Sequence, residues 1–426
     1  MSRVARAIAA AILAVGLVAS CSPAPGPLML WFYVSGNEAK QYRRAAQDCS
    51  TPQYRIGTRL LPRDTDSQRL QLARRLAGND AGLDLMLLDV VWTAEFAEAG
   101  WAVPLPDQTL SQVRAKTLPG PYSTALWKGV LYAFPANTNT QLLWYRKDLA
   151  DHAPSTWAEL IDQAQRLASA GEPGQVAVQG APYEGLMAWF NTLLASAGGA
   201  ILAPDGKTPT LTDTPQHRAA TVTALTIIRD VARARGADPS IAQADETTSR
   251  LALEQGRAAF ELNWPYVLNS VNENAKTGGV VFAPQDLGHS PYPRAQADKP
   301  ARVTLGGFNL AVASTSRHRD LALRAAACIT GEQEQRLTSV DNGVPPTIRA
   351  VFDDPRFQAV YPLWQQVLGQ LQADSAAIRP ATPVYQTLSK LVTAKLSPPG
   401  DIDPERTADV IDQQVRKAVA GEGLVP

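Results

Sequence analysis

Short apolar runs alternate with segments of helical spacing along the first hundred residues of the chain. The run at 28–33 predicts a buried strand, and the run at 83–88 predicts a second strand that ends at Asp89. Between them, apolar positions in 68–77 recur every three or four residues, and residues 92–99 show the same spacing. Strand and helix in alternation predict α/β domains with parallel sheets, in which ligands bind beyond the carboxyl ends of the strands.

Two extended runs farther along the chain, 130–135 and 138–145, are apolar on either side of a polar join. Such a join fits a crossover between two domains. Helical spacing follows at 157–170 and 183–195, and 303–313 predicts a later strand that two glycines interrupt. The pattern therefore predicts a chain that recrosses between its domains.

The N-terminus has the pattern of an export signal. Two arginines precede an apolar run at 7–19, which is too short to span a membrane and ends in small residues before Cys21. The pattern resembles a bacterial lipobox, so 1–20 is a predicted lipoprotein signal peptide and 21–27 a lipid anchor and linker. An ordinary secretory signal with an incidental cysteine is the alternative. We therefore expect a protein held at the cell membrane by a lipid anchor, on its extracytoplasmic face.

Length, charge and cysteine content set the broad class of the protein. At 426 residues the chain exceeds the roughly 250–300 at which a single core stops growing, so we expect two domains. The 40 basic and 40 acidic residues cancel, and nothing predicts binding to nucleic acid. Beyond the anchor only Cys49 and Cys328 remain, both on helical patterns. In an oxidising compartment such a pair predicts a disulfide between distant segments, and two separately buried thiols are the alternative.

Motifs for catalysis, metal binding or nucleotide binding do not stand out. The 4 histidines lie in polar or loop-like stretches without metal-ligand spacing, and no nucleophile elbow, Walker loop or dinucleotide fingerprint occurs. We therefore expect no enzymatic activity, no metal and no cofactor. Two other classes stay open: a cell-surface glycosidase, whose paired carboxylates a sequence does not reveal, and a lipoprotein that acts as an adhesin or scaffold.

Several blocks of sequence in a fixed order resemble a known family. They are the lipobox, the first strand, and residues 87–96, 137–145, 263–266, 306–309 and 379–385. Their order and spacing resemble the extracellular sugar-binding lipoproteins of bacterial ABC importers, in particular the mycobacterial trehalose-binding type. The likeness covers nearly the whole mature chain, although the stretch 265–305 is shorter than the family leads us to expect.

The resemblance implies a two-lobed periplasmic-binding-protein fold, like that of maltose-binding protein, with a ligand cleft between hinged α/β lobes. We assign 28–137 and 276–340 to lobe 1, and 138–275 and 341–426 to lobe 2. The implied ligand is trehalose or a related disaccharide, and another α-glucoside, a maltodextrin or a glycerol conjugate is the nearest alternative. The implied partners are the permease and ATPase subunits of the importer, and we expect a monomer.

A sugar offers hydroxyls in fixed directions and C–H patches on its ring faces. Its site therefore needs carboxylates, amides and arginine at the edges, and an aromatic face beneath. The resemblance assigns these roles to Glu38, Asp89, Asn137, Asn139, Glu246, Trp264, Gly307, Phe308 and Arg379.

Some of these side chains have a direct structural alternative. Asp89 can accept bonds from two hydroxyls, or it can cap the helix that follows. Trp264 is a stacking platform or an ordinary core tryptophan. Glu246 exchanges its role with Asp245 if the alignment slips by one residue, and a solvated loop charge is the structural alternative. Arg379 can give paired hydrogen bonds to adjacent hydroxyls or hold a carboxylate ligand.

The other candidates lie on strands, at the crossover and near a helix start. Asn137 and Asn139 can donate and accept at the crossover, or they can satisfy hinge backbone. Gly307 lets a backbone N–H approach a hydroxyl and Phe308 covers the sugar ring, or both mark a β-bulge. Glu38 is an edge acid for the ligand, or a favourable charge at a helix N-terminus.

Overall fold

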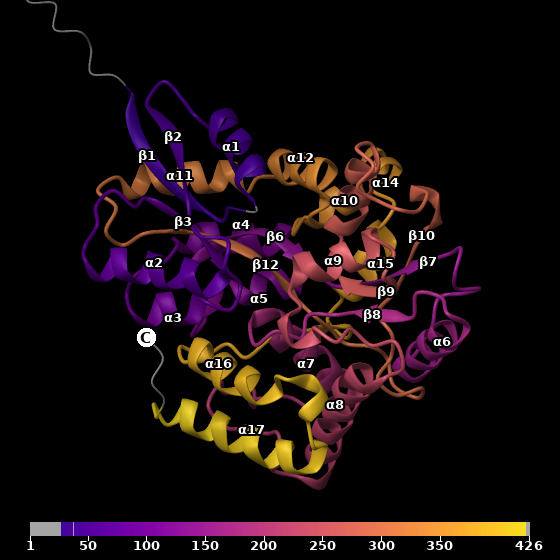
Figure 1. The fold of residues 1–426 in the computed structure, drawn as a ribbon. Helices are drawn as coiled ribbons and strands as arrows, with labels where there is room; N and C mark the ends of the chain where they lie inside the picture. The colour runs from indigo at the N-terminus through magenta and orange to yellow at the C-terminus, as the bar shows by residue number, and fades with distance from the viewer. Residues whose placement is uncertain (1–26, 37, 423–426) are drawn as a thin grey trace, which may run out of the picture.

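Two α/β lobes, each with its own sheet, make up the protein (Figure 1). The computed structural model describes residues 27–36 and 38–422. The predicted signal peptide and Cys21, the predicted lipidation site, lie outside the described residues. Within that part of the chain, no helix combines the length and apolar character that crossing a membrane requires. The predicted two-lobed α/β fold is confirmed.

Lobe 1 is built on a mixed sheet. Its strand order is β2 (Tyr54–Leu60), β1 (Leu28–Val34), β3 (Leu85–Asp89), β12 (Gly306–Val312) and β6 (Ala133–Asn139). β1 is parallel to β2 and β3, whereas β12 is antiparallel to both β3 and β6. The prediction of parallel sheets is therefore wrong for β12, because this strand enters the sheet as the chain returns from lobe 2.

Lobe 2 has a second mixed sheet. Its order is β10 (Leu287–Ser290), β7 (Leu142–Arg146), β9 (Ala258–Asn263) and β8 (Gln175–Ala177), with only the β8 and β9 pair parallel. The chain reaches this sheet from β6 through two residues, Thr140 and Gln141.

The strand β10 corrects one predicted boundary. We assigned 276–340 to lobe 1, but β10 pairs with β7 and so belongs to the lobe 2 sheet. A four-residue edge strand with a single strongly apolar residue, Leu287, leaves almost no hydrophobic pattern in a turn-rich stretch. The other domain boundaries stay predictions.

Helices cover the faces of both sheets (Figure 1). Those of lobe 1 are α1 (Ala39–Asp48), α2 (Thr65–Ala77), α3 (Thr93–Glu98), α4 (Asp107–Lys116), α5 (Pro119–Thr124), α11 (Arg319–Ile329) and α12 (Glu332–Asn342). Those of lobe 2 are α6 (Trp157–Ala170), α7 (Glu184–Ala197), α8 (Pro215–Arg233), α9 (Glu246–Glu254), α10 (Tyr266–Ala275), α16 (Tyr385–Leu396) and α17 (Pro404–Val419).

The remaining elements are short. They are the strand pairs β4 (Leu126–Trp127) with β5 (Val130–Leu131) and β11 (Val303–Thr304) with β13 (Ala376–Ala377), and the helices α13 (Arg349–Asp353), α14 (Pro355–Val360) and α15 (Trp364–Gln370). Single 3₁₀ turns lie at Ile241–Gln243, Pro284–Asp286 and Pro399–Asp401.

Local sequence signals set where the helices begin and end. The helix α6 spans the predicted range 157–170. It begins after Thr156, whose hydroxyl accepts the Glu159 N–H, and it ends at Gly171, which has a φ of +81°. A left-handed residue at this position favours glycine, because a Cβ would crowd the following carbonyl.

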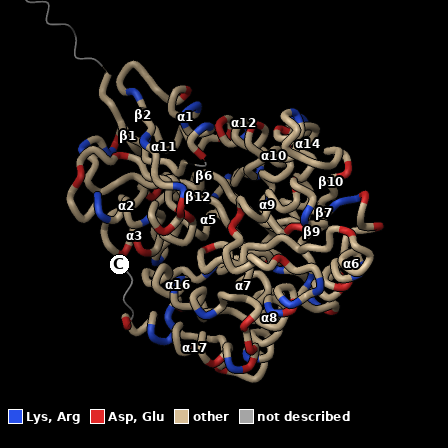
Figure 2. Tube along the Cα trace, viewed as in Figure 1, with Lys and Arg blue, Asp and Glu red and all other residues tan. Residues whose placement is uncertain are grey.

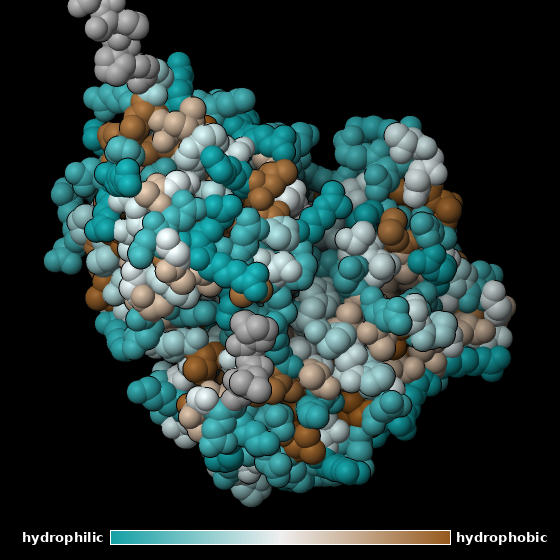
Figure 3. Space-filling view, turned by 60° about the vertical axis from the view of Figure 1, so that its left-hand side comes forward, coloured by the Kyte–Doolittle hydropathy of each residue, from teal (hydrophilic) through white to brown (hydrophobic). Residues whose placement is uncertain are grey.

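The surface matches the balanced composition of the chain. Acidic and basic residues are interspersed along the chain in both lobes (Figure 2). On the face shown in Figure 3, hydrophobic residues lie in small separate groups among hydrophilic ones. A surface of this kind is typical of a protein that works in water.

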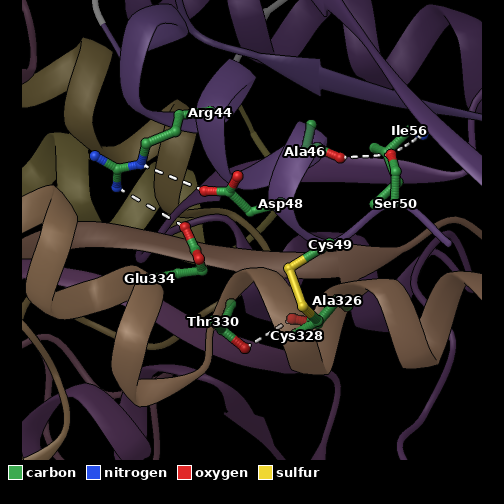
Figure 4. The surroundings of a disulfide bond; sticks show 10 residues. All are labelled: Arg44, Ala46, Asp48, Cys49, Ser50, Ile56, Ala326, Cys328, Thr330 and Glu334. Carbon is green, nitrogen blue, oxygen red and sulfur yellow. Dashed lines mark hydrogen bonds and ion pairs between the residues drawn. A yellow bond between two sulfur atoms is a disulfide. The ribbon is translucent and has the colours of Figure 1, made fainter.

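A disulfide joins Cys49, at the end of α1, to Cys328 on α11 (Figure 4). Their Cα atoms are 5.8 Å apart, and the Cys49 side chain is buried. Beside the bridge, Arg44 lies 3.9 Å from an Asp48 oxygen and 3.8 Å from a Glu334 oxygen. The structure therefore has the bridge between distant segments, not two separate thiols.

Candidate ligand-binding site

Most of the predicted site residues meet where the lobe 1 sheet faces lobe 2. Asp89 ends β3, and the register places Phe308 of β12 opposite both Asp89 and Asn137. From lobe 2, the Trp264 indole lies close to β12. A Cβ atom added to Gly306 of this strand would lie 3.1 Å from the indole. Residues far apart in sequence are thus brought together at one junction.

Arg379 links the two lobes through a buried ion-pair network. Its guanidinium lies 2.5 Å from Oε1 of Glu184 on α7 and 3.5 Å from Oδ1 of Asp89 on β3. Nη2 also donates to the Leu305 carbonyl at 3.3 Å. Arg379 is only 6% exposed. Burial lowers its pKa, but Tyr385, Asp89 and Glu184 together hold that pKa above the ordinary value. The arginine is therefore engaged by the protein itself, which makes it a fixed part of the site wall.

Glu184 is a site residue that the sequence analysis missed. Its Oε1 also accepts a short hydrogen bond from the Tyr385 hydroxyl, and its Oε2 accepts from Ser389 at 2.7 Å. Burial raises its pKa, Arg379 lowers it and Asp89 raises it. In sequence, an acid at the first position of a helix has the ordinary explanation of a favourable terminal charge. No sequence signal marks Glu184, because its partner Arg379 lies 195 residues away in the sequence.

Glu246 and Trp264 form a second pair. The indole Nε1 donates to Glu246 Oε1 at 2.8 Å, and Trp264 is 9% exposed. Asp245, the alternative acid, accepts the Thr248 N–H at 2.8 Å in a capping box at the start of α9. A side chain used in a cap is occupied. Of the two neighbouring acids, Glu246 is thus the one that faces Trp264.

Glu38 immediately precedes α1, but its side chain does not cap the helix. Burial raises its pKa, a hydrogen bond with Ser35 lowers it, and Asp89 raises it further. Its Oε2 is buried without a hydrogen-bond partner among the described residues. A buried carboxylate oxygen in this state can accept a hydrogen bond from a ligand hydroxyl.

We call the set Glu38, Asp89, Glu184, Glu246, Trp264 and Arg379 the junction cluster. The carboxylates of this cluster act on one another: Glu38 and Asp89 both raise the pKa of Glu246, whose first cause is burial. Asp89 also accepts the Val91 N–H at 3.2 Å, so one of its oxygens already has a backbone partner. The cluster thus carries several partly buried carboxylate acceptors, one indole face and a single guanidinium.

The remaining predicted residues shape the strands beneath the cluster. The Asn137 amide donates to the Tyr42 hydroxyl at 3.2 Å and accepts the Phe308 N–H at 3.0 Å, so it serves the fold. Gly307 has a φ of +117°, and a Cβ there would lie 2.5 Å from the Asn137 carbonyl oxygen. The β12 and β6 register shifts next to Phe308. This is a β-bulge, the structural alternative for Gly307 and Phe308.

Asn139 is only partly buried. Its Oδ1 accepts the N–H of Thr140 at 3.2 Å, whereas its Nδ2 donates to no acceptor among the described residues. Among the two predicted asparagines, Asn139 is therefore the one available to a ligand.

A larger hollow lies elsewhere in the molecule. It has a volume of about 730 Å³ and is lined by residues that include Ser155, Tyr292, Arg294 and Gln370. Its described lining contains no carboxylate. A smaller pocket includes Arg379 with Val90 and Val91, next to Asp89. Of the junction cluster, only Arg379 lines that pocket. We place the candidate site at the junction cluster itself, where carboxylates, an indole and a guanidinium converge, because sugar recognition requires convergent polar groups more than volume.

We expect the free energy of unfolding to fall as the pH rises from about 5 to about 9. Burial raises the pKa of Glu246 to about 7 and that of Glu261, on β9, to about 8. The folded state therefore binds these protons more tightly than the unfolded chain. Their contribution is complete below the ordinary carboxyl pKa and is lost as the pH passes through the raised values.

Urea unfolding across that pH range measures the effect. The double variant Glu246→Gln with Glu261→Gln should lose less stability with rising pH than the unmodified protein. An equal pH dependence in the two proteins would contradict the assignment.

Comparisons with known proteins agree with this architecture. The family described as Bacterial extracellular solute-binding protein matches residues 62–336. A probable ABC transporter-binding protein of Deinococcus radiodurans is 27% identical over 341 residues, which cover 76% of this chain and 75% of that protein. The maltotriose-binding protein of Pyrococcus abyssi is 22% identical over 340 residues, or 78% and 69% of the two chains.

Solved structures show the same fold. Maltose-bound MalE3 of T. maritima superposes with a TM-score of 0.80 at 25% identity, over 91% of this chain and 99% of that one. The GacH receptor of Streptomyces glaucescens gives a TM-score of 0.78 at 22% identity, over 92% and 99%. The family match spans more than half of the sequence, and the two-lobed fold agrees with it. The chain belongs to the bacterial extracellular solute-binding proteins.

Proposed function

We propose that this protein binds an uncharged α-linked glucose disaccharide, trehalose in the first place, and presents it to an ABC importer. The junction cluster is the observation that carries the proposal. It offers the Trp264 indole, held by Glu246, beside buried carboxylate acceptors at Glu38 and Asp89. An aromatic face with acceptors around it suits the ring faces and hydroxyls of a sugar.

The distribution of the cluster over two lobes supports a closing mechanism. Glu38 and Asp89 belong to lobe 1, whereas Glu184, Glu246 and Trp264 belong to lobe 2. A ligand that bonds to both sets binds the closed arrangement better than the open one. That difference in affinity is what drives hinge closure. The closed, loaded form is the state that the importer would recognise.

The identity of the sugar rests on two lines of support. Relatives with the names maltotriose-binding protein and maltose-bound MalE3 handle α-linked glucose. The sequence blocks that resemble the trehalose-binding lipoproteins favour trehalose. Another α-glucoside or a maltodextrin is the second candidate, because these relatives bind such sugars. The lipid anchor at Cys21 would hold the protein next to its permease.

The charges of the cluster favour a ligand without negative groups. Arg379 is the cation of the cluster, and it is already paired with Asp89 and Glu184. The nearby Glu38 and Glu246 carboxylates would repel a phosphate or a carboxylate. We therefore expect trehalose to bind and its 6-phosphate to fail.

Thermal unfolding of the mature protein with a panel of ligands tests the proposal. The panel contains trehalose, maltose, maltotriose, trehalose 6-phosphate and glycerophosphocholine. A ligand that binds only the folded state at a hundredfold excess over Kd stabilises it by about 2.7 kcal/mol. A shift with trehalose supports the proposal, a shift with maltose or maltotriose instead supports the second candidate, and no shift with any sugar contradicts both.

A matched pair of tryptophan variants locates the binding. Trp264→Phe should weaken sugar binding about tenfold or more, since it removes the Nε1 bond to Glu246 and reduces the stacking face. Trp127→Phe is the control, because that indole donates to Glu98 at 2.7 Å on the exposed surface. Isothermal titration of both variants compares them. Equal affinities would place the sugar elsewhere.

A further inference from the structure

A carboxyl group lies buried beneath the junction cluster, on the strand that leads to Trp264. Glu261 lies on β9 with no exposed surface, and the register places Trp144 of β7 and Ala177 of β8 opposite it. Burying a carboxyl group is costly unless its partners hold it. Its position therefore requires an explanation in terms of those partners.

Asn263 is the partner through which Glu261 reaches the cluster. Nδ2 of Asn263 donates to Glu261 Oε1 at 2.6 Å and to the backbone oxygen of Glu246 at 3.1 Å. Oδ1 of the same amide accepts the Trp264 N–H at 2.8 Å. The orientation of the amide is fixed, because rotating it would turn its oxygen toward two acceptors.

The same asparagine thus holds both members of the Glu246 and Trp264 pair. It bonds to the backbone of each, and their side chains then meet through the indole Nε1. The Asn263 carbonyl is itself fixed by the Trp144 indole at 3.0 Å. The Tyr266 side chain also hydrogen-bonds to this amide. Without Glu261, the amide would lose its 2.6 Å hydrogen bond, and its rotation would become easier.

We propose that Glu261 is a positioning residue, which orients Asn263 and through it holds Glu246 and Trp264 in the geometry that binds the sugar. The part concerning the sugar rests on the proposed function. The positioning itself does not depend on which ligand binds.

The surroundings of Glu261 show which substitution at this position is conservative. The charged groups that face it are Arg250 and Glu254 of α9, which pair with each other, and α10 contributes the Tyr266 hydroxyl. The residues opposite it on β7 and β8 carry no charge. Burial raises the pKa of Glu261 to about 8, so the carboxyl is mostly neutral near pH 7. Glutamine therefore reproduces its shape, its charge and the oxygen that accepts from Asn263.

The test compares Glu261→Gln with Glu261→Leu by isothermal titration with trehalose and maltose near pH 7. The glutamine variant should bind within about threefold of the unmodified protein, and the leucine variant about tenfold or more weakly. Glu254→Gln is the matched control, because Glu254 is equally buried but pairs with Arg250 and bonds to Ser270 and Asn274, and not to Asn263. A purely structural role would lower stability in the control and the leucine variant alike, without changing the affinity of the folded protein.

The fluorescence of Trp264, measured without ligand, distinguishes the positioning role of Glu261 from the proposed binding of a sugar. The emission of Trp264 is obtained by subtracting the spectrum of each protein's Trp264→Phe counterpart. It should shift to the red in Glu261→Leu and stay unchanged in Glu261→Gln. Where no sugar binds but this shift occurs, the proposed function fails and the positioning role stands. An unchanged spectrum in Glu261→Leu overturns the positioning role. If Glu261→Leu does not fold, Asn263→Ala breaks the same bonds, and an unchanged spectrum there has the same meaning.

Discussion

Replacing Arg379 by alanine is expected to abolish ligand binding and to lower the free energy of unfolding by about 3–5 kcal/mol. The guanidinium is 6% exposed and lies between Asp89 and Glu184. Its loss would leave two buried carboxylates facing each other without a counter-ion. Breaking a buried pair from one side costs more than the pair itself contributes, because the remaining charge stays desolvated.

The loss of stability and the loss of binding in Arg379→Ala have a common origin, but they are measured separately. Urea unfolding gives the loss of stability, and isothermal titration on the folded fraction gives the loss of binding. Arg218→Ala is the matched control, because Arg218 also pairs with two carboxylates, Glu405 and Asp409, but on the exposed surface. Its removal should have little effect on either measurement. An Arg379→Ala protein as stable as the unmodified chain would refute the network.

Adding Glu184→Gln to Arg379→Ala sharpens this prediction. The second substitution removes one of the two unpaired charges. Its amide oxygen can accept from one of the two hydroxyls that bond to Glu184, those of Tyr385 and Ser389, and its N–H can donate to the other. Part of the lost stability should return, whereas ligand binding should not, because the wall of the site would still lack its guanidinium. Recovery of both would mean that Arg379 acts on the ligand only through charge balance.

Strong local patterns made much of the fold predictable from sequence. The run at 28–33 and the helix at 157–170 are present because their apolar spacing agrees with their final burial. The edge strand β10 escaped prediction, because its four residues pair through their backbone and carry almost no hydrophobic signal. The antiparallel orientation of β12 was not predicted for a related reason. The orientation of this strand depends on how the chain returns from lobe 2, and no local sequence pattern shows that.

The site was predictable only as far as residue type and neighbourhood allow. Asp89 at a strand end and Trp264 before a proline carry their own signals, and the structure brings both to the junction. Whether an amide is free depends on partners that are distant in sequence. Asn137 is occupied by Tyr42 and Phe308, which lie 95 and 171 residues away.

Arg379 shows the same limit more strongly. Its residue type suggested a direct contact with ligand, yet its partners are Asp89 and Glu184, the second of which had no signal of its own. A buried charge network is a property of the assembled lobes. The sequence alone does not show that the residues of this network lie near each other, unless the fold is already known.

Removing the disulfide is the second large effect that we expect. The double variant Cys49→Ser with Cys328→Ser should lose about 2–5 kcal/mol of the free energy of unfolding. The bridge spans a sequence separation of 279, which includes much of lobe 2, so in the reduced chain the unfolded state gains conformational freedom. Urea unfolding with and without reductant measures the loss, and the serine variant should be insensitive to reductant.

The location of the bridge predicts that binding survives this loss. Both cysteines belong to lobe 1, because Cys49 directly follows α1 and Cys328 lies on α11. The bridge therefore does not cross between the lobes and leaves closure free. The helix α1 also follows Glu38, but Tyr42 and its hydrogen bond to Asn137 hold that end of the helix independently. The affinity of the folded double variant should therefore stay within about threefold of that of the oxidised protein. A much larger loss of affinity, with the fold intact, would mean that the bridge positions Glu38, and the cluster would then extend through α1 to the disulfide.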